Sequence, residues 1–188
     1  MNAEAPKTPP ARKPVRLWPG LVAAALLVLF KLAVPVLGPG SPPFALLGGL
    51  VGGAVIFLWW VFFSRAPWSE RLGSVVLIAA ALFATSRLVH ESIGNAGGGL
   101  MLPVVALPVV GLVLVAWAAA ARRLADGPRR ATLAASILVA CGGWALLRTG
   151  GVTGKGDADL HWRWTTTPEE RLLAQAADEP SAPPAPEA

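Results

Sequence analysis

Long apolar runs, separated by short connectors rich in proline, glycine or charge, form the hydrophobic pattern of this sequence. A run of about 20 apolar residues is long enough to cross the hydrocarbon core of a bilayer as a helix. The runs lack the polar outer face that a helix on the surface of a soluble domain carries. The pattern therefore predicts five transmembrane helices, over residues 17–37, 44–63, 72–89, 100–121 and 131–147.

Lys and Arg gather in alternate connectors, which predicts the orientation of these helices. They precede the first run and lie between the second and third runs and between the fourth and fifth. The connectors 38–43 and 90–99 contain a single carboxylate, Glu91, and no Lys or Arg. Because short cytoplasmic loops retain positive charge, we expect a cytoplasmic N-terminus and an external C-terminus.

The expected fold is an all-α integral membrane protein with a short external C-terminal helix and disordered termini. Thr167, Pro168 and Glu170 fit a capping box that starts this helix, over residues 168–177. Four regions follow from the pattern: a basic cytoplasmic tail (1–16), a five-helix transmembrane domain (17–148), an external juxtamembrane segment (149–177) and a Pro/Ala-rich linker (178–188).

The composition agrees with a membrane protein, because 54% of the residues are hydrophobic and only 14% are charged. The net charge of +5 does not indicate nucleic-acid binding, since membrane topology explains most of the Lys and Arg residues. The first run is expected to remain as an uncleaved anchor, because no small-residue cleavage site follows it. Cys141 is the only cysteine, which excludes an intramolecular disulfide.

Small residues within two runs indicate how the helices pack. The segment 48–53 contains two overlapping G-x-x-x-G pairs, which flatten one helix face so that another backbone can approach it. This face serves either dimerisation or packing inside one bundle, and the number of internal neighbours favours packing inside the bundle. Pro103 and Pro108 are expected to bend the fourth helix.

Three cations within or next to the apolar runs form the candidate binding site: Lys31, Arg87 and Arg148. They lie near the external ends of the first, third and fifth helices, with Glu91, Asp157 and Asp159 as candidate partners. Together they would bind a lipid phosphate or the carbonyl of a quinone such as ubiquinone. The alternative, which we favour, is that each long side chain reaches the interface separately.

No catalytic or metal-binding constellation is recognisable in the sequence. The segment 150–156 is glycine-rich, but Thr149 and Gly156 replace residues that a phosphate-binding loop requires. His90 and His161 are the only histidines and are far apart in the sequence. We therefore predict no catalytic residue and no metal site.

The segment after the fifth run carries a more specific signal, over residues 147–151, 156–164 and 167–173. It resembles the N-terminal membrane region of bacterial PQQ-binding-like β-propeller proteins, which are BamB-like or quinoprotein-like. The resemblance implies a bacterial inner-membrane protein whose linker leads to a large external propeller. The sequence given stops before any propeller blade, so no PQQ ligand is implied within it, and the chain alone is not expected to be an enzyme.

Two functions follow from this resemblance, and a third is considered from the pattern of the runs. The first is a non-catalytic membrane anchor, whose partners are the lipid bilayer and an external β-propeller domain in cis or in trans. The second is a quinone-binding electron-transfer module, because the plan is similar to that of membrane-bound quinoprotein glucose dehydrogenase. A small transporter is a distant third, since only the fourth run is conspicuously interrupted by proline.

Overall fold

The computed structural model describes residues 16–33, 42–152 and 158–178 and is mostly helical. Five long helical segments form a bundle, and a short helical connection, a β-hairpin and a last helix complete the described part. The bundle consists of α1 (Trp18–Ala33), α2 (Pro42–Leu58) with the π-helical η2 (Trp59–Phe63), α3 (Trp68–Leu88), α5 (Met101–Ala120) with η4 (Ala121–Arg123), and α6 (Asp126–Gly142) with η5 (Gly143–Leu146). The other elements are α4 (Glu91–Gly94), η3 (Ala96–Gly99), β1 (Leu147–Val152), β2 (Ala158–Trp162) and α7 (Pro168–Asp178).

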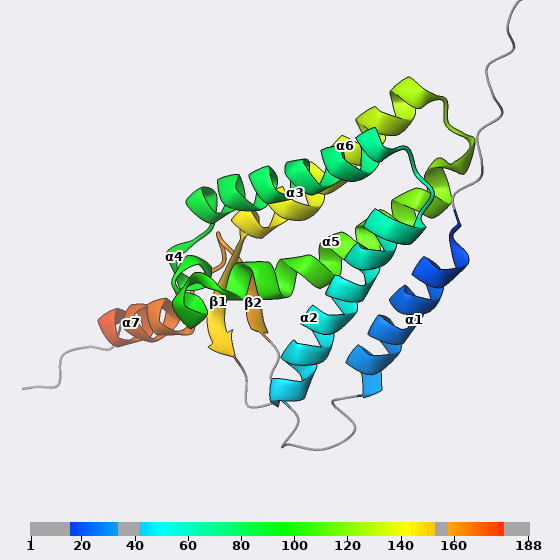
Figure 1. Cartoon of the computed structure of the whole chain (residues 1–188). Helices are drawn as coiled ribbons and strands as arrows, with labels where there is room; N and C mark the ends of the chain where they lie inside the picture. Colours follow the sequence, from blue (N-terminus) through cyan, green and yellow to red (C-terminus); the bar gives the residue numbers. More distant parts are fainter. Residues whose placement is uncertain (1–15, 34–41, 153–157, 179–188) are drawn as a thin grey trace, which may run out of the picture.

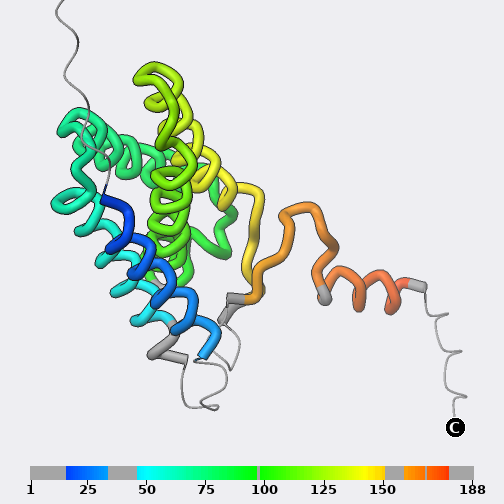
Figure 2. Tube along the Cα trace, turned by 90° about the vertical axis from the view of Figure 1, so that its right-hand side faces the viewer, coloured from blue at the N-terminus to red at the C-terminus, as the bar shows by residue number. Residues whose placement is uncertain are grey.

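Helix α5 lies in the middle of the bundle and packs against both α2 and α6. Helix α1 packs on α2 and touches α5, while α3 packs on α6, so neighbours follow the order α1, α2, α5, α6, α3 (Figure 1). The start of α1 and the α2–α3 and α5–α6 connectors lie at one end, which we call the basic end. Element α4 and the β-hairpin lie at the opposite end, which we call the hairpin end. In Figure 2, α7 projects sideways from the hairpin end.

Glycines allow α1, α2 and α5 to approach closely. A Cβ atom on Gly53 would lie 3.0 Å from the backbone nitrogen of Pro108 in α5. On the other side of α2, a Cβ atom on Gly48 or Gly52 would overlap the Phe30 or Leu27 side chain of α1. The expectation that the G-x-x-x-G segment packs inside the bundle is therefore confirmed.

Three described helical segments are long and apolar enough to cross a membrane: Leu46–Phe63, Trp68–Leu88 and Met101–Arg123. Helix α1 is apolar but shorter, with 16 residues in the described part of the chain, and α6 begins with a polar turn. Large apolar side chains point away from the bundle, and Leu32, Val76 and Val139 are 68%, 68% and 75% exposed. An apolar outer surface of this extent indicates a membrane-associated protein.

The chain is not all-α, which corrects that part of the expected fold. Strands β1 and β2 pair antiparallel, with Leu147 opposite Trp162 and Arg148 opposite His161. The apolar pattern assigned Leu147 to the fifth helix, but the helix changes to a 3₁₀ turn after Gly142 and Gly143, where glycine weakens helical structure. The expected helix at 168–177 is confirmed as α7. The terminal segments 1–15 and 179–188 lie outside the described residues.

Two helices begin earlier than the hydrophobic pattern predicts, because polar residues form part of their first turns. Helix α3 begins at Trp68 rather than at Leu72, and α6 begins at Asp126 rather than at Ala131. Pro128 does not prevent this earlier start, because the first turn of a helix needs no backbone N–H donors of its own. The helices therefore bring several charged residues of the expected loops into the bundle.

Candidate functional sites

The β-hairpin and α7 form a C-terminal arm, which we define as residues 147–152 and 158–178. The arm is bonded to the hairpin end of the bundle. The backbone N–H of Thr149 donates to the hydroxyl of Ser92 in α4 over 3.1 Å. Element α4 is itself fixed, because Ile93 is 1% exposed and packs with Leu102 and Trp144. The first strand of the arm is thereby joined to a buried part of the bundle.

Further contacts hold the second half of the arm. The backbone N–H of Arg163 donates to the carbonyl of Leu146 over 2.9 Å. The side chain of Arg148 donates to the carbonyl of Thr165, so this predicted site residue serves the arm itself. The rings of Trp162 and Trp164 stack, with centroids 5.1 Å apart. These contacts fold the residues between β2 and α7 into a defined turn.

The predicted capping box starts α7 as expected. The backbone N–H of Thr167 donates to the Glu170 carboxylate over 2.7 Å, and the backbone N–H of Glu170 donates to the Thr167 hydroxyl over 2.9 Å. Each bond satisfies a donor at the start of the helix. The beginning of α7 is therefore determined by its own sequence.

The three predicted site cations lie on three different elements. Lys31 is in the last turn of α1, Arg87 is in the last turn of α3, and Arg148 is on β1. Arg87 is exposed and its guanidinium lies 5.1 Å from the ring centroid of Phe83 on its own helix. The surroundings of the three residues differ, and a single site formed by all three stays a prediction.

Of these cations, Lys31 lines an apolar cavity of about 380 Å³ at the hairpin end. The cavity lies between α1, α2 and α5 and extends to the arm. Its other walls include Leu27, Gly49, Pro108 and Trp144. Gly49 opens the wall of α2 here, since a Cβ atom on it would meet the Lys31 side chain at 3.4 Å. An apolar cavity with one cation at its edge is suited to an apolar ring that carries a polar oxygen.

The candidate acidic partners of the cations are placed differently from the expectation. Asp159 forms an exposed ion pair with His161, with 3.0 Å between Oδ1 and Nε2. Glu91 is exposed in the first turn of α4, and Asp157 lies outside the described residues. Within the described ranges, no ion pair joins Lys31, Arg87 or Arg148 to a carboxylate.

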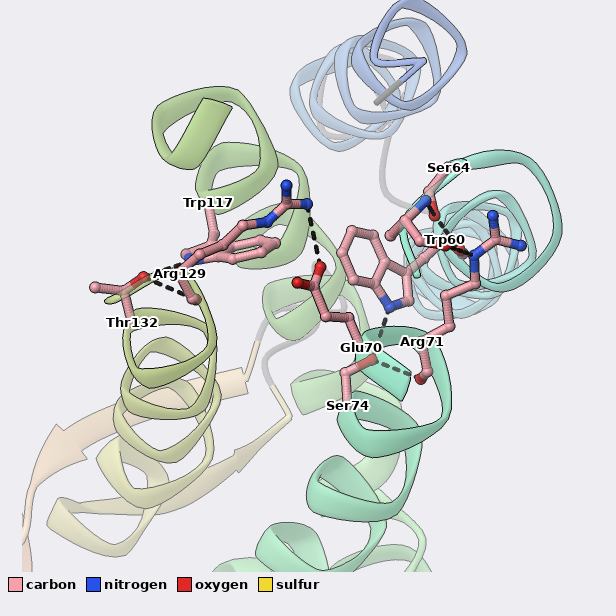
Figure 3. A network of polar contacts seen from close by, with 9 residues as sticks. Trp60, Ser64, Glu70, Arg71, Ser74, Trp117, Arg129 and Thr132 are labelled. Carbon is pink, nitrogen blue, oxygen red and sulfur yellow. Dashed lines mark hydrogen bonds and ion pairs between the residues drawn. The ribbon is translucent and has the colours of Figure 1, made fainter. Parts of the chain in front are cut away.

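A buried ion pair at the basic end was not expected from the sequence. The carboxylate of Glu70 in α3 and the guanidinium of Arg129 in α6 approach to 3.1 Å, and their side chains are 1% and 10% exposed (Figure 3). The guanidinium of Arg129 also lies 5.4 Å from the ring centroid of Trp117 in α5. This ion pair joins α3 to α6 inside the bundle.

Buried polar contacts continue from the ion pair toward α2. The Trp60 indole N–H donates to the hydroxyl of Ser74 over 2.7 Å (Figure 3). Arg71 donates to the carbonyls of Ala66 and Val61 over 2.7 and 2.8 Å, and so satisfies acceptors at the end of η2. Arg71 and Arg129 were interpreted from the sequence as loop cations that set the topology, but both are 8% exposed.

Tryptophans at the basic end belong to the core rather than to an interfacial belt. Trp59, Trp60 and Trp117 are 4%, 0% and 6% exposed, and each indole N–H has a protein acceptor. Trp18 and Trp68, by contrast, are 62% and 61% exposed and remain suited to the headgroup level.

The position of Glu70 in the sequence is a signal from which a paired carboxylate could have been predicted. Glu70 is the only Asp or Glu between Glu4 and Glu91, and it lies beside several cations. A single carboxylate in a basic connector is a candidate for pairing. Its partner was not predictable, because local sequence does not determine that α3 and α6 are neighbours.

The described residues contain no group of three or more His, Cys, Asp or Glu side chains that would hold a metal ion. No protein family, curated protein or solved structure matches this chain at a significant level.

Proposed function

We propose that the protein is a five-span anchor of the bacterial inner membrane that holds an external β-propeller domain. Three helices have the length and composition of membrane spans. Helix α6 packs between two of these, α3 and α5, and exposes the apolar side chains Leu138 and Val139. Helix α1 packs on α2 and is apolar on its outer side as well. All five segments therefore share one lipid-facing bundle in this proposal.

The orientation follows from the two ends of the bundle. The described arginines of the basic end are Arg16, Arg65, Arg71, Arg122, Arg123, Arg129 and Arg130. The positive-inside tendency places this end in the cytoplasm. The hairpin end and the arm then face outward, where a PQQ-like propeller would follow in cis or bind in trans.

The observation that carries the proposal is the attachment of the arm to the bundle. A flexible tether would need no contacts, whereas here Thr149 and Arg163 bond the arm to α4 and to the end of η5. A fixed exit direction is useful to a protein that positions a large external domain close to the membrane.

The test is a folded fluorescent reporter fused directly after Asp178, the last residue of α7. We expect the reporter to stay membrane-bound and external, and to rotate with restricted amplitude in time-resolved anisotropy. Ser92→Ala removes the acceptor of the Thr149 N–H and should widen this rotation.

Ser86→Ala is the matched control, because among the described residues the Ser86 hydroxyl donates to the carbonyl of Phe83 on its own helix and forms no hydrogen bond with the arm. A cytoplasmic reporter, or a rotation that Ser92→Ala leaves unchanged, would contradict the anchor proposal.

The cavity beside Lys31 supports a second candidate function, a quinone-binding module that serves an external quinoprotein dehydrogenase. The cavity is apolar, and the ammonium of Lys31 would donate to a carbonyl of ubiquinone there. Loss of one charge-assisted hydrogen bond weakens binding by about tenfold. Lys31→Gln should therefore raise the dissociation constant of ubiquinone by about this factor.

Arg87→Gln is the control, because Arg87 does not line the cavity. Ubiquinone binding is measured by quenching of intrinsic tryptophan fluorescence in detergent. Absence of binding by the unmodified protein would end the quinone candidate, and equal loss in both variants would refute this site.

A further inference from the structure

A second cavity, of about 250 Å³, lies between α3 and α6 at the basic end. Its walls include Ser69, Glu70, Gly73, Leu77, Arg130 and Leu133. Glu70, the acidic member of the ion pair that joins α3 to α6, therefore forms part of a cavity wall. Neither the anchor function nor the quinone candidate uses this cavity.

The two ends of the cavity differ in polarity. Ser69, Glu70 and Arg130 come from the first two turns of their helices, next to the connectors. Leu77 and Leu133 lie further along the same helices, toward the middle of the bundle. A cavity that is polar next to the connectors and apolar toward the membrane centre fits an amphiphilic molecule.

Glu70 provides an acceptor that the protein does not satisfy. Its Oε2 forms the ion pair with Arg129, but the geometry of this contact is not that of a hydrogen bond. Its Oε1 has no hydrogen-bond partner among the described residues. A buried carboxylate oxygen without a donor carries a desolvation penalty. A ligand that donates N–H groups at this position would remove that penalty.

We propose that this cavity binds the headgroup of phosphatidylethanolamine from the cytoplasmic leaflet. This inference depends on the membrane orientation of the proposed function. The primary ammonium donates to Glu70, the phosphate lies against the exposed guanidinium of Arg130, and the acyl chains follow Leu77 and Leu133.

The charge of the headgroup and its hydrogen-bond donors distinguish phosphatidylethanolamine from phosphatidylcholine and phosphatidylglycerol. A choline headgroup has no N–H to donate and is bulkier at nitrogen. A phosphatidylglycerol headgroup has no cation, so Glu70 would face the hydroxyls of an anionic lipid. Of these three headgroups, the zwitterion with a primary ammonium is the one that matches both a carboxylate and a guanidinium in one cavity.

The experiment is native mass spectrometry of the full chain, delipidated in detergent and titrated with dioleoyl phosphatidylethanolamine, phosphatidylcholine or phosphatidylglycerol. We expect phosphatidylethanolamine to bind about tenfold more tightly than phosphatidylcholine, the effect of one charge-assisted hydrogen bond. Arg130→Gln removes the phosphate contact and should reduce that binding. Gly73→Leu should abolish it, because a Cβ atom on Gly73 meets no other atom within 4 Å and a larger side chain fills the cavity.

Two control variants test whether a loss of lipid binding is specific to residues that line the cavity. Arg122→Gln removes an exposed cation of the same end that does not line the cavity. Gly142→Leu adds the same side chain on α6, at another glycine whose Cβ atom would meet no neighbour within 4 Å. Both are expected to bind phosphatidylethanolamine as the unmodified protein does.

The anchor test measures the location of the reporter and the motion of the arm, so failure of lipid binding can be distinguished from failure of the anchor proposal. Equal binding of the three lipids, or equal loss in Gly73→Leu and Gly142→Leu, would overturn the proposal. Displacement of the lipid by equimolar glycerophosphoethanolamine would also overturn it, because the ligand would then be a soluble phosphoamine. Selective binding that is reduced in Arg130→Gln, lost in Gly73→Leu and unchanged in both control variants would establish it.

Discussion

Replacement of Glu70 by leucine is expected to lower the free energy of unfolding by about 3–5 kcal/mol in lipid-free detergent, since it leaves a charge buried without its partner. The side chain of Arg129 is 10% exposed, and its guanidinium also lies beside the ring of Trp117, which carries no charge. The measurement is unfolding by increasing mole fraction of a denaturing detergent, followed by helical circular dichroism.

The double variant Glu70→Leu/Arg129→Met is the decisive comparison. Removal of both charges leaves no unpaired ion, so the double variant should recover most of the lost stability. The exposed pair of Asp159 and His161 provides a control, and Asp159→Asn should cost less than about 1 kcal/mol. A double variant as unstable as Glu70→Leu would show that an unpaired buried charge is not the cause of the lost stability.

Replacement of Gly53 by leucine is expected to lower the free energy of unfolding by about 3 kcal/mol, through overpacking between α2 and α5. The atoms that a Cβ would meet are backbone atoms of Leu107 and Pro108, at 3.2 and 3.0 Å. Backbone atoms cannot rotate away as a flexible side chain can, so the helices would have to separate. The same detergent unfolding measurement checks this value.

Gly142→Leu is the matched control for Gly53→Leu, because the space around its Cβ position is open. We expect it to change stability by less than about 0.5 kcal/mol, as surface substitutions usually do. Equal destabilisation by the two substitutions would contradict close packing of α2 on α5. Concentration-dependent unfolding of the unmodified protein that is lost in Gly53→Leu would instead assign this face to a dimer.

The helices and their packing glycines were predictable because the physical signals are local. An apolar run of sufficient length determines a membrane helix, and small residues four apart determine a flat face. The start of α7 was predictable for the same reason, since Thr167 and Glu170 satisfy each other's backbone donors within one turn.

The hairpin and the buried ion pair were not predictable in this way. Leu147 continues an apolar run, so the change from helix to strand at Leu147 is not visible in the hydrophobic pattern. Glu70 and Arg129 come together only because α3 and α6 are neighbours, and the order of helices along the chain does not determine their neighbours in space. The basic connectors were correctly found, but their arginines were assigned to topology alone.

The five-span orientation is tested most directly by labelling single cysteines with a membrane-impermeant maleimide in intact spheroplasts. Cys141 is buried and is replaced by alanine in this background. Gly127→Cys lies at the basic end, in the first turn of α6, whereas Asn95→Cys and Gln175→Cys lie at the hairpin end and on α7; all three positions are exposed. We predict that Asn95→Cys and Gln175→Cys react in intact spheroplasts and that Gly127→Cys reacts only after lysis. Labelling of Gly127→Cys and Gln175→Cys from the same side would contradict the account, because α6 would then not cross the membrane.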